Sequence, residues 1–311
     1  MLEQIKNLKP LIARPGNFDL FWKNVLGELD QVPCEVEWKE LGIIRPGLTR
    51  YAVSFTSLAA VRIHGYLLLW DRPAPLVIHT NGYNAPCTMQ SSWARRGVNV
   101  LGFDTRGFGG SADGVSLSAS GHILTGIMDP EESILKGAVC DYIQAHRAVD
   151  DLLDLNGNRA IYYGFSFAGA MAIQAAAIAR SADMVVAGVP SLGWQEQRIQ
   201  LAGNGSALEL KQYIQSFPEA EKAVLRTLSY FDTVHFAPRV SCPTLIGVGL
   251  EDDVVPPETV FAIANHLRCP RQIRVFPSSH AQNDHRIWAA FYRELLKLAM
   301  NPHTACGWGY S

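Results

Sequence analysis

The sequence lacks a long hydrophobic run, a paired-cysteine motif, an excess of basic charge and any internal repeat. No stretch of its 311 residues approaches the ~20 consecutive apolar residues that a membrane-spanning helix needs. Its first residues contain no apolar segment of signal-peptide length. The 27 basic and 29 acidic side chains give a formal net charge of −2, which disfavours a nucleic-acid partner. We therefore expect a cytoplasmic protein that binds neither a membrane nor a nucleic acid.

The six cysteines are scattered along the chain and form no metal or disulfide motif. None belongs to a C-x-x-C pair, and none lies near paired histidines at the spacing of a zinc site. We expect free thiols in a reducing compartment. The glycine-rich stretch 107–111 lacks the G-x-G-x-x-G spacing of a dinucleotide site. Neither a metal nor an organic cofactor is therefore expected.

Apolar residues make up 48% of the chain and charged residues 18%, which is typical of a globular protein with a large core. Short apolar runs alternate with helical patterns along most of the sequence. Because buried parallel strands are continuous apolar runs separated by helices, we predict an α/β fold with a mostly parallel central sheet covered by helices on both faces. The expected strands are 50–55, 61–70, 75–80, 98–103, 160–163, 185–189, 244–248 and 272–276, and the expected helices are 132–153, 168–180, 259–267 and 286–300.

Two segments fall outside this alternation. Residues 1–35 form an N-terminal helical arm, in which apolar side chains at helical spacing predict a helix over 16–30. Residues 191–238 contain helical patterns but no clear strand, so we expect a helical insertion over one end of the sheet. This insertion is either a lid or a set of plain packing helices. We expect residues 1–311 to form one domain that carries both additions.

The segment Gly164-Phe165-Ser166-Phe167-Ala168 joins a predicted strand to an alanine-rich predicted helix. This arrangement is typical of the nucleophile elbow, a tight turn that presents a serine at the edge of an α/β sheet. The turn needs small residues two positions before and after the serine, and Gly164 and Ala168 meet that need. The helix N-terminus behind Ser166 also favours negative charge. Ser166 is the candidate nucleophile, and an incidental serine on a tight turn is the alternative.

A serine nucleophile needs a base and an orienting acid, which follow it along the chain in this architecture. Asp252 comes at the end of the last predicted strand but one, where open α/β sheets place their ligands. Glu251 and Asp253 are the alternatives for the acid. His280 follows the last predicted strand and is the candidate base, with His285 as the alternative. We expect the histidine to take the serine proton and the aspartate to orient the imidazole.

The tetrahedral intermediate of acyl transfer carries an oxyanion that needs two preorganised N–H donors. The first candidate is the backbone N–H of Phe167, which follows the nucleophile. The second is the backbone N–H of Tyr83, in the loop after an early strand. Asn81 in that loop, Phe108 in the glycine-rich stretch and Phe165 beside the nucleophile are expected to line the substrate pocket.

Several segments, in order along the chain, resemble the acetyl xylan esterase / cephalosporin C deacetylase family of carbohydrate esterases, and the resemblance covers residues 14–298. The matching segments are Arg14-Pro15 with Phe18–Trp22 (RP-x-x-FD-x-FW in the family), Asn81–Asn84 (H-G-Y-N), Asp104–Gly109 (D-x-R-G-Q-G), Gly121–Ile123 with Gly126 (N-G-H-I-x-x-G), and Gly249–Asp252 with Pro256-Pro257 (G-L-x-D-x-x-x-P-P). The resemblance implies an α/β-hydrolase fold, a Ser166–Asp252–His280 triad and oxyanion donors at Tyr83 and Phe167. It also implies deacetylation of small sugar esters and assembly into a ring-shaped hexamer built from dimers.

The chain departs from the family's pattern around the expected site. Phe108 and Phe167 stand where the family has glutamine, Ala168 where it has glycine, Asn81 where it has histidine and Ala281 where it has glutamate. The two phenylalanines predict a comparatively apolar pocket, which suits a larger or more hydrophobic acyl group.

Three functions fit these residues. The first is a serine hydrolase that cleaves small-molecule carboxylic esters through an acyl-enzyme. The second is a thioesterase, acyltransferase or lactone hydrolase of a biosynthetic pathway that uses the same three residues. The third is a non-catalytic binding protein with a hydrolase-like fold.

Overall fold

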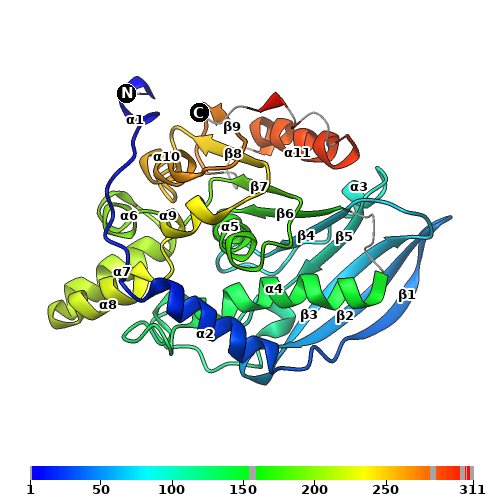
Figure 1. Cartoon of the computed structure of the whole chain (residues 1–311), viewed down its shortest axis with the longest axis horizontal. Coiled ribbons are helices and arrows are strands. Elements are labelled where there is room, and N and C mark those ends of the chain that lie inside the picture. Colours follow the sequence, from blue (N-terminus) through cyan, green and yellow to red (C-terminus); the bar gives the residue numbers. More distant parts are fainter. Residues whose placement is uncertain (1, 154–158, 281–284, 302–304, 306, 309–311) are drawn as a thin grey trace.

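The computed structural model describes residues 2–153, 159–280, 285–301, 305, 307 and 308 (Figure 1). The side chains of residues 151–153 and 285–287 are outside that description. The expected helix over 16–30 and the expected strands and helices of the α/β core all correspond to elements of the structure, with ends that differ by a few residues.

One sheet of nine strands runs through the described part of the chain, in the order β1-β2-β3-β5-β4-β6-β7-β8-β9. Strands from β5 to β9 in that order are parallel, while β1, β2 and β3 are antiparallel to their neighbours. The predicted α/β class with a mostly parallel sheet is confirmed. The strands are β1 (Glu37–Arg45), β2 (Leu48–Ser57), β3 (Val61–Trp70), β4 (Leu76–Thr80), β5 (Asn99–Phe103), β6 (Ala160–Phe165), β7 (Met184–Gly188), β8 (Thr244–Gly249) and β9 (Arg271–Phe276).

Helices cover both faces of this sheet (Figure 1). The α-helices are α1 (Leu2–Ile5), α2 (Phe18–Asp30), α3 (Ser91–Ala94), α4 (Ile134–Leu153), α5 (Phe167–Ala179), α6 (Gln195–Leu201), α7 (Gly205–Ser216), α8 (Glu221–Ser229), α9 (Thr233–Phe236), α10 (Pro257–His266) and α11 (His285–Met300). Short 3-10 helices are η1 (Leu58–Ala60), η2 (Gly109–Ser111), η3 (His122–Leu124), η4 (Pro218–Ala220) and η5 (Ala237–Arg239).

Alternate side chains of the central strand β6 show which helices lie on which face. Tyr162 contacts Tyr142 of α4, with ring centroids 4.9 Å apart. Its neighbour Tyr163 points the other way and contacts Trp93 of α3 and Tyr292 of α11. Because successive side chains of a strand point to opposite faces, α4 lies on one face and α3 and α11 lie on the other.

The N-terminal arm and the 191–238 insertion pack against each other. The apolar face of α2 is buried, and the indole Nε1 of Trp22 donates a hydrogen bond to the Tyr230 carbonyl at 3.1 Å. Rings of Phe231 and Phe236 meet Trp22 edge-on. Helices α6, α7 and α8 of the insertion lie at the end of the molecule opposite β1 (Figure 1). The insertion therefore holds the arm in place and borders the end of the sheet where the site lies.

Strand β1 is an exposed edge strand that the sequence pattern did not predict. Its side chains do not alternate between buried and exposed positions, and Trp38, Leu41 and Ile43 are exposed. It pairs only with β2, through a register interrupted at two places. A strand without a buried face has no periodic pattern to detect, so its position depends on its pairing with β2.

Within the described residues, no helix is both long and apolar enough to cross a membrane. In the same part of the chain, no three histidine, cysteine, aspartate or glutamate side chains are arranged to hold a metal ion.

Candidate active site

Ser166 lies on the turn between β6 and α5, with backbone angles φ +57° and ψ −118°. Its N–H donates to the Gly188 carbonyl at 2.9 Å, and its carbonyl accepts from the Ser191 N–H at 3.1 Å. Gly164 is required by space, because a Cβ there would lie 2.0 Å from the Ala168 carbonyl oxygen. The strained turn thus presents the Ser166 side chain at the carboxyl edge of the sheet, as in a nucleophile elbow.

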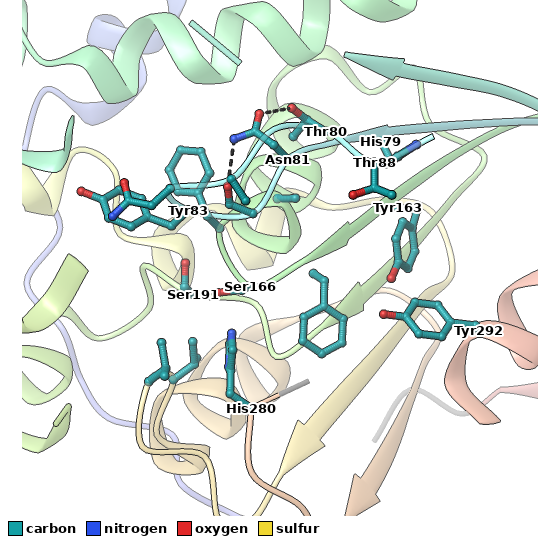
Figure 2. A pocket seen from close by; sticks show the side chains of 18 of the residues that line it. His79, Thr80, Asn81, Tyr83, Thr88, Tyr163, Ser166, Ser191, His280 and Tyr292 are labelled. Atoms are coloured by element: carbon teal, nitrogen blue, oxygen red, sulfur yellow. Dashed lines mark hydrogen bonds between the residues drawn. The ribbon is translucent and has the colours of Figure 1, made fainter. Parts of the chain in front are cut away.

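His280 and Asp252 meet beside this turn. The imidazole Nδ1 lies 2.7 Å from Oδ2 of Asp252, and the two residues are only 6% and 4% exposed. The other carboxylate oxygen, Oδ1, accepts the backbone N–H groups of Val254 and Val255 at 2.9 and 2.8 Å. Because Nδ1 donates to the carboxylate, Nε2 keeps its lone pair, and the ring points toward Ser166 (Figure 2).

The structure does not support the alternative acids, Glu251 and Asp253, as partners of His280. Glu251 and Asp253 flank Asp252 but are exposed, and only Asp252 is hydrogen bonded to His280. The side chain of His285 lies outside the described residues. The structure therefore brings together the three residues that the sequence put first.

The two residues that carry the candidate oxyanion donors, Tyr83 and Phe167, line the same cavity as Ser166. Phe167 is the first residue of α5, so its N–H has no partner within the helix. Tyr83 lies in the loop after β4, and its hydroxyl donates to Glu209 Oε2 at 2.6 Å and accepts from the Ile123 N–H at 3.0 Å. Burial and the Glu209 carboxylate raise the pKa of the Tyr83 hydroxyl, which therefore stays protonated. These bonds fix the loop that carries the Tyr83 N–H.

Asn81 borders the cavity, but its amide serves the loop itself. Its Oδ1 accepts the Thr105 N–H at 2.8 Å and the Thr80 hydroxyl at 3.1 Å, while its Nδ2 donates to the Gly82 carbonyl at 2.9 Å (Figure 2). Asn81 therefore holds the loop in shape, and its polar atoms are engaged away from a substrate.

The two predicted pocket phenylalanines differ in position. Phe165 lines the cavity and meets the His280 ring edge-on, with centroids 5.9 Å apart. Phe108 does not line it, which corrects the expectation from sequence. Its ring stacks on His122 at 4.1 Å and touches Tyr83 and Phe167 edge-on from behind. An aromatic ring gains more from this buried cluster than from facing solvent, so Phe108 supports the oxyanion loop from behind.

A cavity of about 880 Å³ surrounds Ser166 and His280. It extends from the connection between α6 and α7 to α3 and α11. Its lining is mixed in polarity, not comparatively apolar as the sequence suggested, because only Phe167 of the two substituted phenylalanines reaches it. Lining residues that sequence analysis missed include Ser191, Arg198 and Ser206 near the insertion, and His79, Tyr163 and Tyr292 at the other end. Of these, Tyr163 could have been found, since it lies two residues before Phe165 on the same strand face.

His79, Tyr66 and Cys87 form a buried polar cluster beside this cavity. The Tyr66 hydroxyl lies 2.6 Å from Nε2 of His79, and Cys87 Sγ lies 3.7 Å from its Nδ1. Burial lowers the pKa of His79 to about 4 and raises the pKa of the Cys87 thiol. The imidazole is therefore neutral and the thiol protonated, so Cys87 is no rival nucleophile.

The sequence model of the acetyl xylan esterase (AXE1) family matches residues 1–298. The chain belongs to the acetyl xylan esterase family. This confirms the resemblance inferred from the motifs. Among curated proteins, the acetyl esterase Axe7A of Xylanibacter ruminicola is 24% identical to this chain over 288 residues. The match covers 87% of this chain and 64% of that protein. The chain thus spans less than two thirds of that relative's length.

Two solved structures of acetyl xylan esterases resemble this family member closely in fold. The enzyme from Paenibacillus sp. R4 has a TM-score of 0.85 and 26% identity, covering 94% of this chain and 99% of that one. Acetyl xylan esterase 1 from Thermoanaerobacterium sp. has a TM-score of 0.82 and 25% identity, with coverage of 94% and 99%. The α/β-hydrolase architecture expected for the family is therefore confirmed.

Proposed function

We propose that this chain is a serine esterase that removes small acyl groups, acetyl among them, from ester substrates. The observation that carries the proposal is the His280 imidazole, held by Asp252 and pointing at Ser166 on its strained turn. Membership of the acetyl xylan esterase family supports the same chemistry.

The residues have distinct roles in the proposed reaction. His280 Nε2 takes the proton of the Ser166 hydroxyl as its oxygen attacks the ester carbonyl carbon. Backbone N–H groups of Tyr83 and Phe167 stabilise the oxyanion of the tetrahedral intermediate. The imidazolium, stabilised by Asp252, gives its proton to the leaving alcohol. Water activated by the same imidazole then attacks the acyl-enzyme and releases the acid.

The cavity bears on the substrate. Its volume of about 880 Å³ far exceeds an acetyl group, so it has room for a sizeable alcohol portion beside the acyl group. Hydroxyl-bearing side chains around it suit a polar alcohol such as a sugar. A thioester, a lactone or a longer acyl group is the alternative, and the same three residues would act on it.

Covalent labelling tests the proposal. A fluorophosphonate probe should label the wild-type protein and fail to label Ser166→Ala, because only the activated serine forms the phosphonate ester. Ser191→Ala is the matched control, since Ser191 lines the same cavity and should leave labelling intact. Absence of wild-type labelling, or labelling that persists in Ser166→Ala, would favour the non-catalytic alternative.

A substrate panel then separates the candidate activities. We expect p-nitrophenyl acetate to be hydrolysed with a kcat/KM at least tenfold higher than a p-nitrophenyl ester of eight carbons or an acetyl thioester. A tenfold ratio corresponds to about 1.4 kcal/mol in the barrier. Preference for the longer ester or the thioester would replace deacetylation by the alternative.

A further inference from the structure

Arg198 of α6 is a buried arginine in the wall of the active-site cavity. It is 2% exposed, and its guanidinium donates to Gln195 Oε1 at 3.0 Å and to the Ser206 hydroxyl. Its Nε has no hydrogen-bond partner within the described residues. Among the described residues, the other deeply buried arginine is Arg106, whose guanidinium donates three hydrogen bonds to the Asp141 carboxylate. The contrast identifies Arg198 as a cation without a directly bound anion.

The carboxylates around Arg198 are bonded elsewhere. Asp232 accepts three backbone N–H groups, from Trp194, Gln195 and Val234. Glu209 accepts the Tyr83 hydroxyl. Both carboxylates act on Arg198 only through longer-range electrostatic attraction, and within the described residues neither forms an ion pair with it. Burial lowers the pKa of Arg198 only to about 10, so the side chain is charged at neutral pH.

The charged groups that line the cavity are mostly cationic. Among the described residues, the arginines are Arg96, Arg198 and Arg293, and the carboxylate is Asp253. Arg96 and Arg293 are exposed at the α3 and α11 end, whereas Arg198 is buried near the insertion. A cavity with this lining attracts anions, and its buried cation offers the stronger interaction because water screens it least.

We propose that the substrates of this site are esters that also carry a carboxylate, and that Arg198 binds this carboxylate. The inference rests on the proposed esterase function and deepens it. A guanidinium binds a carboxylate through charge-assisted hydrogen bonds. Each terminal nitrogen of Arg198 has a second N–H beside the one bonded to Gln195 or Ser206, and these are the donors for the carboxylate. The ester group then lies at Ser166. The carboxylate belongs either to the acid portion or to the alcohol portion of the substrate.

Two matched substrate pairs test both placements. In the acid arm, p-nitrophenyl hemiglutarate is compared with neutral p-nitrophenyl valerate. In the alcohol arm, acetoxyacetate is compared with neutral acetoxyacetamide. We expect Arg198→Gln to lower the ratio of kcat/KM for the charged over the neutral substrate at least tenfold in one arm. Arg198→Lys should lose less, because it keeps the charge. Arg226→Gln, an exposed charge removal on α8, should leave both ratios within twofold of wild type.

The outcomes separate this inference from the esterase proposal. If the wild-type protein hydrolyses p-nitrophenyl acetate but Arg198→Gln leaves both ratios unchanged, the carboxylate site is overturned and the esterase stands. If the wild-type protein hydrolyses no ester, the esterase proposal itself fails. If Arg198→Gln proves unstable, an inhibition experiment on the wild-type protein tests the carboxylate site instead. Glutarate and glycolate should inhibit wild-type hydrolysis of p-nitrophenyl acetate, at least threefold more weakly in 0.5 M than in 0.05 M salt, whereas their neutral amides should not inhibit. Absence of inhibition by either carboxylate would overturn the carboxylate site.

Discussion

At the scale of single residues, the backbone of Ser166 is strained. A φ of +57° with a ψ of −118° is disfavoured for any residue with a Cβ, by about 1–3 kcal/mol. The strain persists because Gly188 and Ser191 hold the turn by hydrogen bonds to both sides of the serine. Ser166, the proposed nucleophile, is thus held in this conformation at a cost in stability.

This strain predicts a difference in stability between two variants of Ser166. Ser166→Gly should be about 1 kcal/mol more stable than Ser166→Ala, because glycine relieves the backbone strain by more than it adds unfolded-state entropy. Both lack the serine hydroxyl, so the comparison isolates the effect of the backbone. Denaturant unfolding measures it, and equal stability of the two variants would show that the turn is not strained.

The candidate site residues show which positions the sequence specifies. Ser166, Asp252 and His280 each follow a strand of the parallel sheet, and the carboxyl ends of such strands meet at one edge. Phe108 also follows a strand, but the turn of the loop decides whether its ring faces the cavity, and the sequence does not specify that turn. Arg198 has no motif around it, and only the packing of α6 brings it to the cavity wall.

At the scale of elements, α2 shows the limits of a correct helix prediction. Its apolar spacing predicts the helix and its buried face, but not what covers that face. The structure shows the cover to be the 230–236 segment of the insertion, which contacts Phe18, Phe21 and Trp22. This contact joins the N-terminal arm to the 191–238 insertion, and no local sequence pattern predicts it.

Removal of this contact should destabilise the whole domain. Trp22→Ala is expected to lower the free energy of unfolding by about 3–5 kcal/mol, because it leaves a cavity among buried rings and an unpaired Tyr230 carbonyl. Lys23→Ala is the matched control on the exposed side of α2 and should change stability by about 0.5 kcal/mol or less. Urea unfolding measures both. A Trp22→Ala effect as small as the control would mean that the arm is dispensable.

At the scale of the whole molecule, buried histidines make stability depend on pH. Burial lowers the pKa values of His79, His122 and His235 from 6.5 to about 4. The unfolded chain therefore binds protons between pH 6.5 and 4 that the folded chain does not, and folding loses stability as the pH falls through this window. Burial also raises the pKa of Asp232 to about 6, which acts in the opposite direction.

The expected acid sensitivity can be measured directly. At pH 5 each of the three histidines should cost about 2 kcal/mol relative to pH 8, and Asp232 should offset about 1 kcal/mol in total. Thermal or urea unfolding across pH 8 to 4.5 should show this net decline, and His235→Asn should remove about two fifths of it. A stability that stays constant down to pH 5 would contradict the assignment of neutral buried histidines.

Assembly and location belong to the same scale and stay predictions. The family resemblance implies a ring-shaped hexamer, and the composition led us to expect a cytoplasmic protein. The division of residues 1–311 into one domain with an arm and an insertion also stays a proposal.

The contact between α2 and the insertion has a consequence for synthesis in the cell. Trp22 and the Tyr230 carbonyl that it binds are separated by 208 positions along the chain. At about 5–20 residues per second, the ribosome needs roughly 10–40 s to make the partner after the tryptophan has been added. During that interval the rings of Phe18, Phe21 and Trp22 lack their partners from the 230–236 segment. The native burial of this part of α2 is therefore completed only when the last third of the protein is being made.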